Sequence, residues 1–306
     1  MAIQTEVWTS DVQKMLYQKS PFLAVAKNFD SLAMNLTVHL PQSYDSASVI
    51  TKGRSSWPAT VTSVTDTIKS FSLESYTTAP IKVPYIDDVQ LSYSKRENVL
   101  NQFMDDMAET VGKNALHSWA ITNTSGTTGT RIRKTTGALE ATLSVGATGT
   151  RSGLTLADIS FAVSVLDTDK ISRDNRYMVV PSEMWQAFLV TADGEKVLNA
   201  DFMNRGNLPE GIVSKVFGLN VMVCPEVVVY DGSQVLKAVG SASASTDNYG
   251  AIVFHADSVC KAQETTKFFS QENAPEYYGS IFSSELLFGS SKTRSDEKGI
   301  AMIVQQ

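Results

Sequence analysis

The fold is decided by residues 81–120, IKVPYIDDVQLSYSKRENVLNQFMDDMAETVGKNALHSWA. Residues 81–93 alternate apolar and polar side chains, which is the two-residue period of half-buried strands. Ser94 and Glu97 then match a capping box, and an apolar stripe at helical spacing follows. The stripe consists of Leu100, Met104, Met107, Val111, Ala115 and Trp119. A helix over residues 94–120 would be about 40 Å long, against about 11–12 residues for an average helix, so we predict a strand that feeds a long framework helix.

The segment upstream of this helix predicts an extended arm. Residues 36–41, LTVHLP, form a short apolar strand, but residues 42–80 are dominated by Ser, Thr and charged side chains. Threonine-rich segments suit β hairpins, yet this one has too little apolar material for a core of its own. A long loop without structure is improbable inside a compact domain. We therefore expect an arm that a neighbouring subunit covers.

Several residues on the arm and the helix are candidates for that subunit interface. Lys52, Arg54 and Trp57 cluster where Gly53 and Pro58 would bend the arm. Trp57 is either a chance surface residue or an anchor for a neighbour's pocket, and the thin core of the arm favours the anchor. The helix adds Arg96, Asp105 and Asp106 to the candidates. The two adjacent acids point away from the apolar stripe, which favours a solvated or interfacial face over a catalytic pair.

The order of these elements resembles the major capsid proteins of tailed bacteriophages with the HK97-like fold. Residues 154–190 look like that family's helix, strand, proline and second helix, and residues 215–227, KVFGLNVMVCPEV, look like its next strand. Residues 277–304, YYGSIFSSELLFGSSKTRSDEKGIAMIV, look like its closing strands. The resemblance spans the chain and is carried by the order of elements, since no motif in it has its own chemistry.

The resemblance implies an α+β fold of the HK97-like type. Its parts would be an N-terminal arm (residues 1–35), an extended β arm or E-loop (36–80), and a peripheral strand with the long spine helix (81–121). A flexible or hairpin-bearing surface segment (122–153), an axial α/β domain (154–265) and closing strands of both domains (266–306) would follow.

The resemblance also implies a function, which is to assemble as hexamers and pentamers into an icosahedral shell around double-stranded DNA. Partners would be copies of the same chain, a portal protein, possible decoration proteins, weakly held DNA and a separate scaffolding protein, because the arm begins too early for a fused one. The protein would belong to the virion and assemble in the cytoplasm of the host bacterium. An encapsulin-like nanocompartment shell and a soluble α/β enzyme using the region of Ser182 are the alternatives.

Composition is compatible with a shell protein and sets limits on other functions. The 306 residues carry a formal net charge of −6, which disfavours a protein that grips nucleic acid through Lys and Arg. The two cysteines, Cys224 and Cys260, lie outside any C-x-x-C motif, and whether they pair is open. Neither a signal peptide nor a membrane-spanning run of about 20 apolar residues is expected.

The chain has no recognisable phosphate-binding or metal-binding motif, so we expect no cofactor and no metal. The Gly- and Thr-rich segment 122–153 fails the Walker A pattern, because Lys134 is not preceded by glycine. His39, His117 and His255 are isolated from one another and from other ligands in the sequence.

Catalytic motifs are missing as well, and we predict no enzyme. No G-x-S-x-G elbow exists, and Ser182 in VVPSEMW is better explained as a helix N-cap. Two more acidic pairs, Asp87 with Asp88 and Asp167 with Asp169, could be offered as general acid–base couples or calcium ligands. The second pair lacks the glycine and the twelfth-position glutamate of an EF-hand loop, so we predict a turn that ends a helix there.

The last expectation concerns how the shell would be held. Some capsids of this fold join an arm lysine to a neighbour's asparagine, which needs a carboxylate in an apolar pocket. Lys52 has Thr51, Arg54 and Ser55 around it, so its amine should stay protonated and unreactive. We therefore expect contacts that are not covalent.

Overall fold

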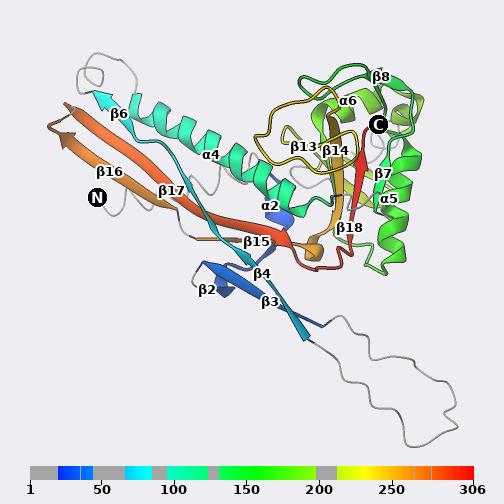
Figure 1. Ribbon diagram of the computed structural model, residues 1–306, viewed down its shortest axis with the longest axis horizontal. Coiled ribbons are helices and arrows are strands. Elements are labelled where there is room, and N and C mark those ends of the chain that lie inside the picture. Colours follow the sequence, from blue (N-terminus) through cyan, green and yellow to red (C-terminus); the bar gives the residue numbers. More distant parts are fainter. Residues whose placement is uncertain are drawn as a thin grey trace, which may run out of the picture.

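A computed structural model of the chain describes residues 20–34, 36–43, 66–84, 95–122, 131–197, 212–264, 266–276 and 278–306. The described part is elongated (Figure 1). We use the name peripheral domain for the long helix with its sheet, and the name axial domain for the mixed sheet with two helices at the other end. A small three-stranded sheet, the arm sheet, projects from the region where the two domains meet.

The peripheral domain consists of helix α4 (Lys95–Trp119) packed along strand β17 (Gly279–Lys292), as Figure 1 shows. Its sheet has the order β1-β15-β17-β16, and two strands from the region before α4 also pair with β17. The other strands are β1 (Lys27–Asn28), β5 (Glu74–Thr77), β6 (Ile81–Pro84), β15 (Val259–Gln263) and β16 (Lys267–Ala274). Strands far apart in the sequence thus share one sheet under one helix.

The long helix was predicted within one residue at each end. Its apolar stripe faces the core, because Met104, Met107, Val111, Ala115 and Trp119 are all buried. The side chain of Leu100 and the proposed capping residue Ser94 lie outside the described residues. The helical period of apolar side chains therefore decides which face of α4 packs on the sheet.

The axial domain is built on a seven-stranded sheet of order β11-β12-β10-β14-β18-β7, with β13 paired to β14. Helices α5 (Leu156–Thr168) and α6 (Ser182–Leu189) belong to the same domain. Its strands are β7 (Ile132–Lys134), β10 (Arg176–Pro181), β11 (Ser214–Val216), β12 (Leu219–Cys224), β13 (Val228–Tyr230), β14 (Asn248–His255) and β18 (Ile300–Val304). Strands β10 and β12 are parallel, whereas β14 is antiparallel to β10 and β18.

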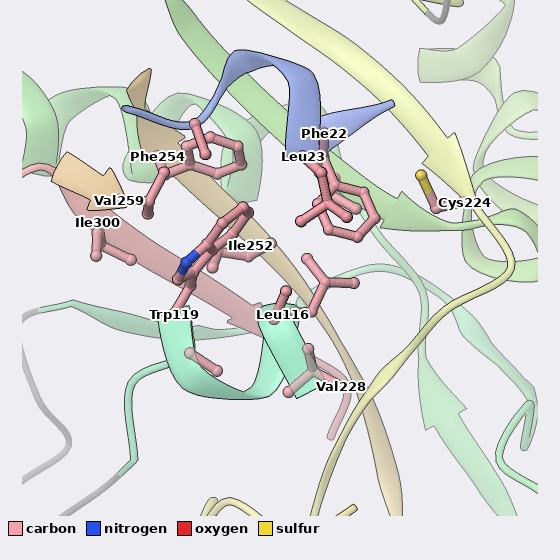
Figure 2. Packing of buried hydrophobic residues seen from close by; sticks show 14 of the residues in the cluster. Phe22, Leu23, Leu116, Trp119, Cys224, Val228, Ile252, Phe254, Val259 and Ile300 are labelled. Carbon is pink, nitrogen blue, oxygen red and sulfur yellow. The ribbon is translucent and has the colours of Figure 1, made fainter. Parts of the chain in front are cut away.

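Both faces of this sheet are buried, each in a different core. Along β14, Ala251 and Val253 pack with α5 and α6, whereas Ile252 and Phe254 pack with the end of α4. Figure 2 shows the second core, in which Trp119 lies against Phe254. Successive side chains of a strand point to opposite faces, so a central strand between two packed layers places every side chain in one core or the other. This explains why every residue of β14 is buried.

Two helix starts in the axial domain test the capping predictions. Thr155 and Asp158 form the predicted capping box at the start of α5. The prediction for Ser182 is wrong: the N-cap of α6 is Pro181, and no side chain caps the helix. Strand β10 runs straight into the helix at Pro181, so Ser182 is already the first helical residue and is displaced from the capping position.

The Gly- and Thr-rich region after α4 contains regular structure. Strand β7 pairs in parallel with β18 at the edge of the axial sheet. Strands β8 (Leu139–Ala141) and β9 (Thr150–Ser152) then form a separate hairpin. The pair of β8 and β9 fits the hairpin-bearing segment expected over residues 122–153, and β7 adds an edge strand to the axial sheet.

The remaining described elements are short. Helix α2 (Phe22–Val25) packs into the core around Trp119, and two 3-10 helices, η1 (Asp30–Leu32) and η2 (Ala256–Ser258), precede β2 (Ala33–Met34) and β15. Cys224 and Cys260 are both buried and free, which answers the open question of their pairing. Every helix in the described residues is too short or too polar to span a lipid bilayer.

Candidate functional site

The arm sheet consists of β2 (Ala33–Met34), β3 (Thr37–Ser43) and β4 (Asp66–Ser72). Strands β3 and β4 pair along their whole length, from Thr37 opposite Ser72 to Ser43 opposite Asp66, and form what we call the arm ribbon. The ribbon leads away from both domains in Figure 1. It continues the strand predicted at residues 36–41 and places β4 inside the segment predicted as an arm.

The ribbon is packed at one end and open along its length. Near the body, Val38 and Leu40 pack with Cys260 and Ala262 of β15. Strand β4 is mostly exposed, and the side chain of Ile68 is 72% exposed. An isolated two-stranded hairpin is at best marginally stable in water. The ribbon therefore depends on contacts at its base and on any surface that covers its exposed side.

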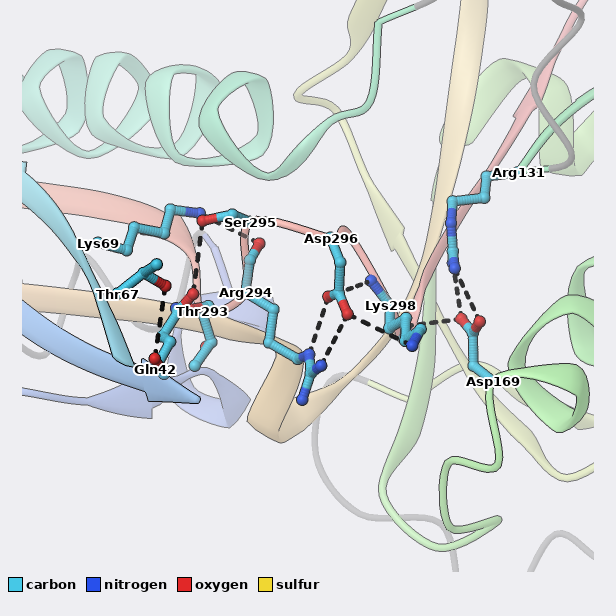
Figure 3. A network of polar contacts seen from close by, with 11 residues as sticks. Gln42, Thr67, Lys69, Arg131, Asp169, Thr293, Arg294, Ser295, Asp296 and Lys298 are labelled. Carbon is cyan, nitrogen blue, oxygen red and sulfur yellow. Dashed lines mark hydrogen bonds and ion pairs between the residues drawn. The ribbon is translucent and has the colours of Figure 1, made fainter. Parts of the chain in front are cut away.

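A polar junction holds the ribbon to the segment between β17 and β18, residues 293–299, which we call the hinge segment (Figure 3). The Lys69 ammonium donates to the carbonyl oxygens of Lys292 and Arg294, the second at 3.2 Å. The Gln42 amide donates to the carbonyl oxygen of Thr293. Burial, and then the nearby Lys292, lower the pKa of Lys69. Both strands of the ribbon are thus tied to one connection in the body.

The hinge segment is itself tied together by ion pairs. Arg294 donates two hydrogen bonds to the Asp296 carboxylate, at 2.8 and 2.7 Å, and Lys298 lies 3.5 Å from the same group. The Arg294 hydrogen bond is the main reason that the pKa of Asp296 is lowered to about 2. Bidentate Arg–carboxylate pairs fix orientation as well as distance. The segment therefore has a defined shape where the chain passes between domains.

The far end of the hinge segment is fixed to the axial domain. Asp169, directly after α5, accepts two hydrogen bonds from Arg131 at 2.6 and 2.7 Å and one from the Gly299 amide at 3.0 Å. Its pKa is lowered, because these hydrogen bonds outweigh the opposing effect of burial. The arm ribbon, the hinge segment and the axial domain consequently form one connected polar network (Figure 3).

Most of the predicted interface residues lie outside the described part of the chain. This holds for Lys52, Arg54 and Trp57, and also for the side chain of Arg96, whose backbone belongs to α4. On the same helix Asp105 is half-buried and Asp106 is exposed. The role of these residues at an interface therefore stays a prediction.

The histidines have ordinary surroundings. His39 is exposed on β3, and His117 is half-buried on α4, where burial lowers its pKa. The His255 Nδ1 accepts a hydrogen bond of 3.2 Å from the Asp257 amide at the start of η2. Within the described ranges, no three His, Cys, Asp or Glu side chains gather as a metal site would require.

The acidic pair of α5 is used in ion pairs. Asp167 contacts Arg173 and Arg176, each at 2.8 Å, and Asp169 forms the C-cap of the helix. The helix does end at this turn, as predicted. Asp87 and Asp88 lie outside the described residues.

Sequence reasoning missed the junction at Lys69 and Gln42. The only signal was the alternation of charges in KTRSDEK, residues 292–298, between two apolar strands. That pattern indicates an ion-paired connection, but nothing in it points to β4, 223 residues away. The arm ribbon, helix α4 and the ion-paired hinge segment are features of a structural subunit. They do not resemble the parts of a catalytic site.

Comparison with known proteins agrees with this class. A family model described as phage capsid protein matches residues 44–303, and the chain belongs to this family. It is therefore a structural protein of the virion capsid and not an enzyme, which rules out the α/β enzyme alternative. No curated protein matches the sequence.

Solved structures show the same fold at low sequence identity. The capsid of Ralstonia phage GP4 has a TM-score of 0.65 and 12% identity, covering 92% of this chain and 86% of the other. The head of Helicobacter pylori bacteriophage KHP40 has a TM-score of 0.63 and 11% identity, covering 94% of this chain and 91% of the other. The structure from Mycobacterium phage Che8 has a TM-score of 0.59 and 12% identity, covering 92% of this chain and 90% of the other. The expected HK97-like α+β fold is confirmed.

Proposed function

We propose that this capsid protein assembles as hexamers and pentamers into an icosahedral shell that encloses double-stranded DNA. The observation that carries the proposal is the arm ribbon, which extends from the body with most of β4 exposed. Such a ribbon gains stability when another copy of the chain covers it. A contact between different surfaces of identical subunits closes into rings when the rotation between subunits closes.

The rigid parts of the subunit support this geometry. Helix α4 spans 25 residues and is packed along β17, so it resists bending between neighbours. The polar junction fixes the ribbon to the body through Lys69 and Gln42. A ring or shell requires each subunit to present its contacts at a set angle. The junction supplies one such angle.

The charge of the chain suits a container for DNA. A net charge of −6 disfavours tight binding to phosphates, which depends on Lys and Arg. Packaged DNA would then touch the shell only weakly. A portal protein, a separate scaffolding protein and decoration proteins are further partners under this proposal, and the host bacterial cytoplasm is the place of assembly.

The test is to purify the protein after expression and to image it by negative-stain electron microscopy. Closed particles with pentameric and hexameric units support the proposal, and a small discrete oligomer contradicts it. Nuclease-protected nucleic acid in particles from infected cells separates a DNA shell from an encapsulin-like compartment. Particles that hold an enzyme and no DNA would favour the compartment.

A further inference from the structure

Three distant segments meet at the side chain of Glu226. This residue lies between β12 and β13, and its side chain faces Gly112 of α4 and Ser20, which is two residues before α2. The Ser20 hydroxyl donates a hydrogen bond of 2.9 Å to the Glu226 Oε1. Ser20 is completely buried, and Glu226 is 3% exposed. The contact therefore joins the start of the described chain to the axial domain across the helix.

The helix makes room for this contact with a glycine. A Cβ atom at Gly112 would lie 2.6 Å from the Ser20 Oγ and 3.1 Å from the Glu226 Oε1. Glycine is the poorest helix former after proline, so its presence inside α4 needs a reason. Close approach of the other two segments to the helix backbone supplies that reason. The three-way contact is thus built into the spine helix.

The Glu226 carboxyl is only partly compensated for a full charge in this place, because the Ser20 hydroxyl donates to Oε1 alone. Its second oxygen, Oε2, is buried and has no hydrogen-bond partner among the described residues. A buried carboxylate oxygen without a partner is strongly disfavoured, whereas the neutral acid is tolerated. The residues from Ser20 to Ala26 bring no charged side chain to it.

The charged groups that face Glu226 come from α4 and from its own turn. Glu109 and Lys113 lie on α4 and pair with each other. The Cys224 thiol, whose pKa burial raises to about 12, stays neutral. Burial raises the pKa of Glu226 and Glu109 raises it further, against opposing effects of the Glu226 amide, Ser20 and Lys113.

We propose that Glu226 is a pH-sensitive latch, which holds the segment from Ser20 to Ala26 on α4 while it is protonated and releases it when it ionises. The segment includes α2, whose Phe22 and Leu23 are completely buried beside Trp119. Phe22 meets the Trp119 ring edge-on, with 5.7 Å between centroids. Release would uncover one edge of the main core. The latch acts within one chain and does not depend on the proposed shell.

The direction of the pH effect follows from the two states of the latch. The closed state binds the Glu226 proton more tightly than the open state, where the carboxyl is in water. The opening equilibrium therefore grows by about tenfold per pH unit between the pKa of the open state and that of the closed state. Below the pKa of the open state the closed form of the latch is favoured most, and above the pKa of the closed state the equilibrium constant for opening no longer changes with pH.

Hydrogen–deuterium exchange of the full-length protein tests the latch. The peptide spanning residues 20–26 is followed between about pH 5 and about pH 8, with rates corrected for intrinsic exchange. In the wild type, protection should fall with rising pH, whereas in Glu226→Gln it should not depend on pH. Glu195→Gln changes an exposed glutamate on the same domain and should behave as the wild type. A wild-type peptide with constant protection, or a Glu226→Gln variant that keeps the wild-type slope, overturns the proposal.

Two further variants keep the test decisive if Glu226→Gln does not fold. Ser20→Ala removes the hydroxyl that donates to the carboxyl, so the fall in protection should begin at the same pH as in the wild type and continue to a higher pH. Gly112→Ala crowds Ser20 and should lower protection at every pH without changing the slope. An unchanged midpoint in Ser20→Ala, or full protection in Gly112→Ala, contradicts the latch.

Discussion

Replacing Lys69 by Met should loosen the arm ribbon without unfolding the body. The change keeps the length and apolar stem of the side chain and removes its ammonium. The carbonyl oxygens of Lys292 and Arg294 then lose this donor, while the packing of Val38 and Leu40 on β15 is untouched. The variant therefore tests the polar junction separately from the apolar contact beside it.

The size of the effect follows from the two hydrogen bonds. A hydrogen bond to a charged group contributes about 1.5–3 kcal/mol, and water can replace part of it at a half-buried site. We expect a net loss of about 2 kcal/mol for the closed position of the ribbon, or about thirtyfold more opening. Global stability should change far less, because the junction lies outside the two main cores.

Hydrogen–deuterium exchange of the peptide containing Asp66–Ser72 measures this opening, and circular dichroism checks the fold. Exchange of β4 should accelerate by about thirtyfold while exchange of β14 stays unchanged. Lys267→Met, which removes an exposed lysine from β16, is the matched control and should match the wild type. Equal exchange of β4 in Lys69→Met and Lys267→Met would refute the role of the junction.

Four other outcomes follow from the structure and the sequence. Trp119→Ala should lower the free energy of unfolding by about 3–5 kcal/mol in urea titrations, because the ring is fully buried; a loss below about 1 kcal/mol would contradict its place in the core. Ile68→Asp should change monomer stability by less than about 0.5 kcal/mol yet block particle formation in electron micrographs, and normal particles would show that the ribbon is not covered there. Because the pKa of Asp296 is lowered to about 2, its ion pairs stabilise the fold above the pKa of the unfolded state and are lost as pH falls through about 2; Asp296→Asn should lack this part of the acid dependence in thermal melts. Boiled particles should run as a single band in denaturing gels, and a ladder that disappears in Lys52→Ala would show covalent joining.

The outcomes for α4 and α5 show what a sequence can determine. In both helices the signal is local: an apolar stripe repeats every three to four residues, and the α5 capping box needs only Thr155 and Asp158. Such interactions depend on a few consecutive residues, so the tertiary structure had little to add. The order of these elements also sufficed for the resemblance to a capsid family.

Local signals misled where the surrounding fold sets the backbone. Ser182 has the residue type of an N-cap, but β10 enters the helix at Pro181 and displaces it from that position. The Gly- and Thr-rich composition after α4 predicted a flexible or hairpin-bearing segment, which fits the pair of β8 and β9, but it gave no sign that β7 pairs with β18 at the sheet edge. In both places a partner distant in sequence decides the conformation.

The amino-acid sequence by itself determined helices α4 and α5, the polar character of the arm and the lack of catalytic motifs, because each depends on residue type and short spacing. Only the tertiary structure decided which side chains meet. Lys69 reaches a carbonyl 223 residues away, and Ser20 reaches Glu226 across 206 residues. No periodicity links such positions, since their contact arises from the packing of whole sheets and helices. The polar junction and the buried carboxyl therefore become visible only when those elements are assembled.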